Sequence, residues 1–362
     1  MDLAQTLLIG TRKGLFILER AAGEWRVAEH AFRGDPVTMA LHDPRDGALY
    51  GALNLGHFGI KLHRSGDGGG TWEELAAPAY PAQEEGGEDA PSVDLIWSLE
   101  AAGADVPGVL WAGTIPGGLF RSDDRGESWT LNQPLWDRED RGRWFGGGYD
   151  DPGIHSIAID PRDSRRLIVA VSCGGVLRSE DGGESWATCT QGLWAYYVPP
   201  EQRDSPEIQD PHRLVRCPAN PEALWIQHHN GVFRSQDGAG SWQEILDLPV
   251  SNFGFAVAVH PSDPMTAWFV PADSDERRMP VDGQIVVLRT RDGGRSFQVL
   301  TDGLPPAPAY DLVYRHGLDV DASGEALAMG STTGGLWTSD DGGTTWQLFS
   351  AHLPPIYCVR FC

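Results

Sequence analysis

The chain has 362 residues, and 51 Asp and Glu outnumber 28 Lys and Arg, which gives a formal net charge of −23. This acidic balance argues against a nucleic-acid partner, because the phosphates would be repelled. The five cysteines are dispersed and have no C-x-x-C spacing, so we expect neither a disulfide framework nor a structural zinc.

The N-terminal ten residues carry no basic region and no long apolar stretch. We therefore expect no secretion signal, no membrane span and a cytoplasmic protein. Residues 5–10 have the character of a strand. Further apolar strands are expected at 37–44, 154–161 and 255–261, and each of these ends in a Pro-containing turn.

An eight-residue phrase, Ser-x-Asp-x-Gly-x-Ser/Thr-Trp, recurs along the chain. Ser and Asp side chains bond back to nearby backbone amides, and Gly supplies the positive φ of a tight turn. A short strand precedes each copy and another follows it, which predicts a hairpin. The copies lie at 65–72, 122–129, 179–186, 235–242 and 339–346, with a weaker one at 290–297.

Aromatic residues close each copy and set the period of the repeat. Neighbouring ones are 47 to 57 residues apart, and seven copies match the roughly four to eight blades of known propellers. We predict an all-β fold, a seven-bladed β-propeller of four-stranded blades that occupies 1–362 as a single domain. The closing residues are Trp25, Trp72, Trp129, Trp186, Trp242, Phe297 and Trp346.

The first copy of the repeat lacks its innermost strand, because the chain begins directly at the second. A matching strand stands at the far end, at 356–361. The C-terminal strand is therefore predicted to join the N-terminal blade and close the ring, which removes exposed sheet edges.

The repeated phrase resembles the Asp box, or BNR repeat, of sialidases and sortilin-type receptors. The resemblance implies a propeller whose phrase-bearing turns lie on the face opposite the usual site. Sialidases are six-bladed and use an arginine triad, a Tyr/Glu pair and an Arg-Ile-Pro motif, and here only Thr114-Ile-Pro116 is present. The chain therefore resembles a sialidase-like repeat protein without the sialidase catalytic motif.

Aligning the inner strands gives one equivalent position per blade, which we expect to point toward the propeller axis. Three of the seven are histidines, and the pair His228 and His229 ends a neighbouring strand. Imidazoles that converge on one point suit Zn, Mn, Fe or Cu. A metal site made by His155, His212, His316 and His228 is one interpretation; a metal-free ligand site and a structural cluster are the others. The seven positions are Thr38, Trp97, His155, His212, Phe255, His316 and Tyr357.

Two long loops, 132–153 and 192–212, precede two of these histidines, and loops of this length inside a compact repeat are often functional. Asp151 and Asp210 stand just before His155 and His212, where they could orient the imidazoles. With Tyr357 they are the catalytic candidates. Aromatic and Arg side chains suit a polar, sugar-like ligand, and the substrate-binding candidates are Trp97, Trp144, Tyr149, Trp194, Arg143 and Arg278.

Three functions follow from this pattern. The first is an enzyme, a metal-assisted hydrolase or lyase that acts on a small polar or saccharide-like molecule at the channel mouth. The second is a BNR-type glycoside hydrolase. The third is a non-enzymatic protein-interaction scaffold. Cys173 near His155 allows a Cys/His nucleophile pair, although an inert buried thiol is favoured.

Overall fold

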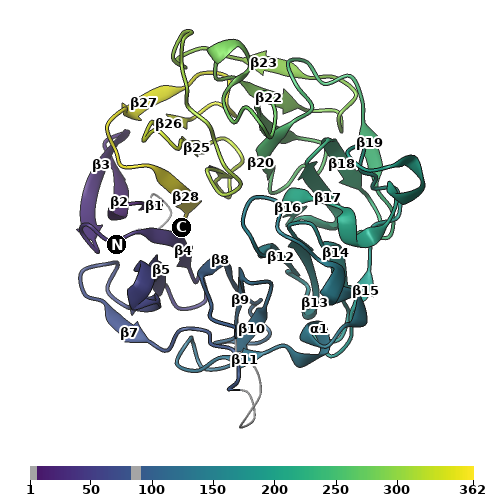
Figure 1. The fold of residues 1–362 in the computed structure, drawn as a ribbon. Coiled ribbons are helices and arrows are strands. Elements are labelled where there is room, and N and C mark those ends of the chain that lie inside the picture. Colours follow the sequence, from purple (N-terminus) through teal and green to yellow (C-terminus); the bar gives the residue numbers. More distant parts are fainter. Residues whose placement is uncertain (1–5, 83–90) are drawn as a thin grey trace.

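The computed structural model describes residues 6–82 and 91–362, which form seven four-stranded antiparallel sheets around a central axis (Figure 1). The predicted all-β, seven-bladed propeller is confirmed. The sheets are β28 (Ile356–Phe361), β1 (Thr6–Thr11), β2 (Gly14–Ala21) and β3 (Glu24–Ala31) in blade 1; β4 (Val37–His42), β5 (Leu49–Asn54), β6 (Ile60–Ser65) and β7 (Glu73–Leu75) in blade 2; β8 (Leu95–Ala101), β9 (Leu110–Ile115), β10 (Leu119–Ser122) and β11 (Thr130–Leu131) in blade 3; β12 (Ile154–Asp160), β13 (Asp163–Val171), β14 (Gly175–Ser179) and β15 (Ala187–Thr188) in blade 4; β16 (Pro211–Cys217), β17 (Asn220–His228), β18 (Gly231–Ser235) and β19 (Gln243–Ile245) in blade 5; β20 (Gly254–Val259), β21 (Ala267–Pro271), β22 (Val287–Thr290) and β23 (Gln298–Leu300) in blade 6; and β24 (Leu318–Val320), β25 (Leu327–Gly330), β26 (Leu336–Ser339) and β27 (Gln347–Ser350) in blade 7.

Helical turns lie only in connections among the described residues, and none is long and apolar enough to cross a membrane. They are η2 (Gly56–Phe58), α1 (Gln133–Trp136), η3 (Glu139–Arg143), η4 (Pro200–Gln202), η5 (Pro206–Ile208) and η6 (Val281–Gly283).

The ring closes through the two ends of the chain, as predicted. Strand β28 pairs with β1, with Cys358 opposite Gly10 and Phe361 opposite Leu7. Figure 1 shows this C-terminal strand in yellow beside the purple N-terminal blade. A Cβ on Gly10 would lie 2.6 Å from the Cys358 Sγ, so this strand pair tolerates only glycine there without rearrangement.

The recurring phrase forms the same hydrogen-bonded turn between the third and fourth strands of six blades. In residues 179–186, Ser179 Oγ donates to Asp181 Oδ1 and accepts from the Gly183 amide, both at 2.8 Å. Asp181 Oδ1 also accepts from the Ser185 amide at 2.9 Å. The other five turns repeat these three bonds within 2.8–3.0 Å.

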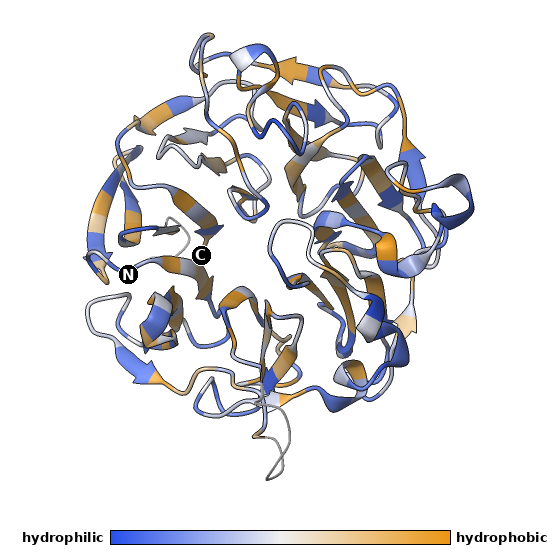
Figure 2. Cartoon of the chain, in the orientation of Figure 1, coloured by the Kyte–Doolittle hydropathy of each residue, from blue (hydrophilic) through white to orange (hydrophobic). Residues whose placement is uncertain are grey.

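The core consists of apolar layers between neighbouring blades. Trp225 of β17 is fully buried, and its ring centroid lies 5.8 Å from that of Phe269 on β21 in the next blade. Trp111 and Trp268 occupy second strands of other blades and are buried as well. Apolar residues are frequent in the strands in Figure 2, while the outermost strands and the connections carry many hydrophilic residues. The packed blades therefore position the loops at the two ends of the channel.

Candidate functional site

One residue bulges at the start of six of the seven innermost strands. The register between β12 and β13 skips His155, and the register between β16 and β17 skips His212. A β-bulge leaves one residue unpaired and re-aims its side chain. Five of the seven positions aligned in the sequence are bulges of this kind against the second strand (Thr38, Trp97, His155, His212 and Phe255), and a sixth, Tyr357, is skipped between β28 and β1.

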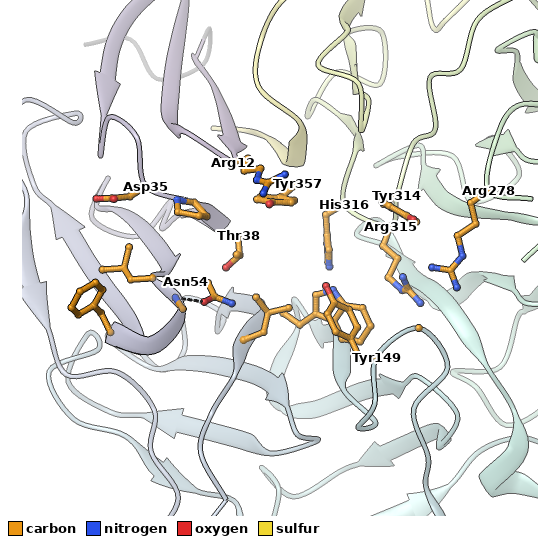
Figure 3. A pocket seen from close by; sticks show the side chains of 17 residues that line it. Arg12, Asp35, Thr38, Asn54, Tyr149, Arg278, Tyr314, Arg315, His316 and Tyr357 are labelled. Carbon is orange, nitrogen blue, oxygen red and sulfur yellow. Dashed lines mark hydrogen bonds between the residues drawn. The ribbon is translucent and has the colours of Figure 1, made fainter. Parts of the chain in front are cut away.

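A pocket of about 910 Å³ opens at the end of the channel where these strands start (Figure 3). Its wall combines inner-strand starts with connections from second to third strands, which is the face predicted from the sequence. The turn phrases lie at the opposite ends of the strands. Residues that line the pocket include Arg12, Asp35, Thr38, Asn54, Trp97, Tyr149, Arg278, Tyr314, Arg315, His316 and Tyr357.

Arg315 reaches across the pocket floor from blade 7. Its guanidinium carbon lies 4.6 Å from the Trp97 ring centroid and 5.5 Å from that of Phe255, which belong to blades 3 and 6. Arg315 is 8% exposed, and its Nε has no hydrogen-bond partner among the described residues. Burial lowers the pKa of this guanidinium, while the charge of Asp210 raises it. Two aromatic faces thus hold a cation in a dry position.

Asp210 lies beside two histidines next to this floor. Its Oδ2 is 3.4 Å from His212 Nε2 and 3.3 Å from His229 Nδ1. Burial acts to raise the pKa of Asp210, but the histidines and Arg315 hold it well below its usual range. Among the residues that the structure describes, these three form the one group of His, Cys, Asp or Glu whose potential ligand atoms all lie within 4.8 Å of one another.

The predicted set of four histidines is arranged differently. His228 accepts a hydrogen bond from the Asp210 amide at 3.1 Å and packs against Phe233, so His229 rather than His228 lies beside His212. Strand β17 ends at His228, and the chain turns there, which places the following residue toward the mouth.

In the described part of the chain, neither His155 nor His316 belongs to a group of three or more potential metal ligands. His155 Nδ1 lies 2.9 Å from Ser156 Oγ, and neither ring nitrogen of His316 has a hydrogen-bond partner there. Burial lowers the pKa of both imidazoles well below the ordinary value, and nearby arginines lower it further. Both rings are therefore neutral at pH 7.

Beyond Asp210 and the histidines described above, four further predicted side chains do not line the pocket. Trp144 is 7% exposed and packs in the core between blades 3 and 4, because it lies over Gly117 and Gly174. Two of the others have partners of their own: the Trp194 indole donates to Glu244 at 2.8 Å, and Arg143 pairs with Glu207 at 3.1 Å. Asp151 is exposed, and its charge acts to raise the pKa of Arg141.

Five predicted residues do line the pocket: Trp97, Tyr149, Arg278, His316 and Tyr357. The sequence analysis missed Arg12, Asp35, Tyr314 and Arg315. Arg315 directly precedes the aligned His316, so a search that included the neighbours of each aligned position would have found it. Cys173 is buried, and burial raises the pKa of its thiol far above the ordinary value, which leaves it inert.

No protein-family profile matches the chain. A xyloglucanase of Paenibacillus sp is 27% identical over 285 residues, which cover 69% of this chain and 26% of that protein. The chain spans 22% to 32% of the length of the curated relatives it matches.

Solved structures share the fold. The GH74 enzyme of Niastella koreensis superposes with a TM-score of 0.64 at 18% identity, covering 95% of this chain and 52% of that one. A structure described as YCF48 bound to D1 peptide superposes with a TM-score of 0.54 at 14% identity, covering 94% of this chain and 87% of that one. These structural similarities show that the chain shares the propeller fold.

Proposed function

We propose that the protein is a glycoside hydrolase whose saccharide substrate binds in the channel-mouth pocket. The observation that carries this proposal is the pocket itself, which offers aromatic faces beside polar and charged groups at the size of a small oligosaccharide. The xyloglucanases among its relatives support the same reaction class. We also propose that the six hydrogen-bonded turns are Asp boxes.

Asp35 is the carboxylate on the pocket wall, and we assign it the proton exchange with the glycosidic oxygen. Hydrolysis breaks the bond between that oxygen and the anomeric carbon: Asp35 gives its proton to the leaving oxygen, the oxygen of a water molecule bonds to the carbon, and the proton that this water releases returns to Asp35. Burial raises the pKa of Tyr357, so this phenol stays protonated at neutral pH and serves as a hydrogen-bond donor. Asp210 is 3% exposed and already contacts two histidines, so it acts through them rather than on the substrate.

The test is a screen of purified protein against xyloglucan oligosaccharides and a panel of neutral and acidic oligosaccharides, with products identified by mass. Hydrolysis adds one water to the summed mass of the products, whereas elimination adds none, so the two reaction classes are separated. Asp35→Asn should lower kcat by about a hundredfold or more, because a positioned proton donor contributes that much.

Asp123→Asn is the matched control, because this carboxylate is exposed in a turn on the opposite face and pairs with Arg121. Its kcat should equal that of the wild type. A protein that cleaves no saccharide of the panel, or that keeps full kcat as Asp35→Asn, would contradict the proposal.

A divalent metal at Asp210, His212 and His229 is a second candidate, favoured by one observation. The His212 Nδ1 lies 2.6 Å from the Gly254 carbonyl oxygen and must donate a proton to it. Burial lowers the pKa of His212, so its other nitrogen carries a lone pair, and this lone pair faces the Asp210 carboxylate. Two acceptors that face each other need a proton or a cation between them.

Metal analysis after incubation with Zn²⁺ or Mn²⁺ shows whether a metal ion or a proton lies between His212 and Asp210. Wild-type protein should retain one equivalent of metal through gel filtration, and Asp210→Asn and His229→Ala should retain none. His155→Ala is the control and should bind like the wild type, because it lies outside the cluster. Metal-free wild-type protein would leave a proton as the bridging cation.

A further inference from the structure

The buried guanidinium of Arg315 has no counter-ion in contact. It forms no ion pair with a described residue, and its Nε donates no hydrogen bond there. The charge of Asp210 raises the pKa of Arg315 without contact between the two groups. The Asp210 carboxylate instead contacts His212 and His229. A buried charge without a partner is costly, and such groups normally acquire one.

A second guanidinium increases this cost instead of relieving it. The charge of Arg278 lowers the pKa of Arg315, as expected for two cations that face the same space. Figure 3 shows Arg278 and Arg315 on one side of the pocket, with Tyr314 beside Arg315. The Arg278 guanidinium lies 3.9–4.0 Å from the position that a Cβ on Gly148 would occupy, so it extends from blade 6 over the loop before blade 4.

The balance of charge on the pocket wall is opposite to that of the whole chain. Arg12, Arg278 and Arg315 contribute three positive charges there, and Asp35 contributes one negative charge. The protein as a whole carries −23. His316 is also unpartnered in the described part of the chain and only 6% exposed, and it faces the same space. A local excess of positive charge on so acidic a protein favours the binding of an anion there.

We propose that Arg315 and Arg278 bind a carboxylate on the substrate, and that the natural ligand is an acidic saccharide. This inference rests on the proposed function, because it names the substrate class of the same pocket. A guanidinium presents two parallel N–H donors that match one carboxylate, and the burial of Arg315 strengthens the bonds that it donates. The sugar ring would then lie against Tyr149 and Trp97 on the wall.

The experiment is calorimetric binding of trigalacturonic acid and of its methyl ester, which has the same rings without the negative charges. The acid should bind the wild type about tenfold or more tightly than the ester, the size expected for charge-assisted hydrogen bonds. Arg315→Met and Arg278→Gln should each remove this preference, and Arg315→Lys should restore only part of it. Glucose 6-phosphate is run beside glucuronic acid, whose C6 is a carboxylate, to separate phosphate from carboxylate recognition.

Arg165→Gln is the control, because this arginine is exposed on the opposite face and pairs with Asp163. It should keep the preference for the acid. Arg278 is exposed, so its variant tests the inference even when substitution of the buried Arg315 disturbs folding, which thermal unfolding reports.

The outcomes separate this inference from the proposed function. Tight binding of the acid without cleavage of any saccharide would support the anion site and overturn the hydrolase. Cleavage of neutral saccharides with equal affinity for acid and ester would overturn the anion site alone. Preference for the phosphate over the carboxylate would also overturn the acidic saccharide as ligand.

Discussion

Two sets of polar side chains on opposite faces of the ring differ in whether their partners lie within the protein. On the turn face, six turns repeat the same three internal hydrogen bonds, so that Ser179 and Asp181, for example, satisfy each other and the backbone. On the mouth face, Arg315 and His316 are buried with polar atoms that no described residue satisfies. The first arrangement is what stability requires. The second is expected where a site has been kept ready for a ligand.

The turns repeat the same residues in six blades, whereas the pocket wall does not. A turn that recurs in six blades cannot distinguish one blade from another, so it supports the fold and selects no ligand. The pocket draws different residue types from equivalent positions, with Thr38 in blade 2, Trp97 in blade 3 and Tyr357 in blade 1. We therefore expect the differences among equivalent positions to determine which ligand the proposed site binds.

Low pH should lower the stability of the protein through the buried histidines near the mouth face. His155 and His316 are neutral in the folded protein with a pKa below the ordinary 6.5, so below that pH the unfolded chain binds protons that the folded chain does not. The free energy of unfolding therefore has its full value above pH 6.5. Below pH 6.5 it decreases by about 1.4 kcal/mol per pH unit for each histidine. Urea unfolding at pH 7.5, 6 and 5 measures this slope.

His316→Phe should flatten the slope, because its ring nitrogens have no partner in the described residues and lose no hydrogen bond. His57→Gln is the control and should keep the wild-type slope, since His57 is exposed in η2. An unchanged slope in His316→Phe would show that this imidazole is protonated in the folded state.

The repeat made most of the fold predictable from the sequence. Residues 154–161 were expected to be an innermost strand, and β12 occupies Ile154–Asp160. The aligned positions proved to be bulges, which explains why one alignment located both His155 and His212. Ring closure followed from the one strand that blade 1 lacks, and β28 supplies it.

The site was less predictable because it depends on which side chains already have partners. Nothing in the sequence shows that Trp194 donates to Glu244 or that Trp144 packs against Gly117 and Gly174, which lie in the turns of two neighbouring blades. The choice between His228 and His229 depended on where β17 ends, and strand alternation cannot be extended beyond that residue. The lack of a counter-ion at Arg315 is likewise a property of the assembled ring.

The turn face should show a smaller effect that is confined to stability. Ser179→Ala removes a buried hydroxyl and leaves the Gly183 amide without its acceptor, which should cost about 1–3 kcal/mol of unfolding free energy. Ser185→Ala is the matched control on the same turn, because its hydroxyl is exposed and water replaces the bond to Asp181. Urea unfolding measures both variants. Loss of saccharide binding in the folded Ser179→Ala protein would contradict the separation of the two faces.

Replacing Arg315 should change the stability of the ligand-free protein only slightly. Arg315→Met keeps the long side chain between Trp97 and Phe255 but removes a buried charge that no carboxylate contacts. Replacing such a charge with an apolar group of similar length is often neutral or stabilising, here by up to about 1 kcal/mol, because the lost cation–π attraction offsets part of the gain. Thermal and urea unfolding of the ligand-free variant measure the change. A gain in stability together with a loss of acid binding would show that the buried cation is retained for the ligand, as expected when a functional group opposes folding. A strong loss of stability would instead make Arg315 a structural bridge between blades 3, 6 and 7.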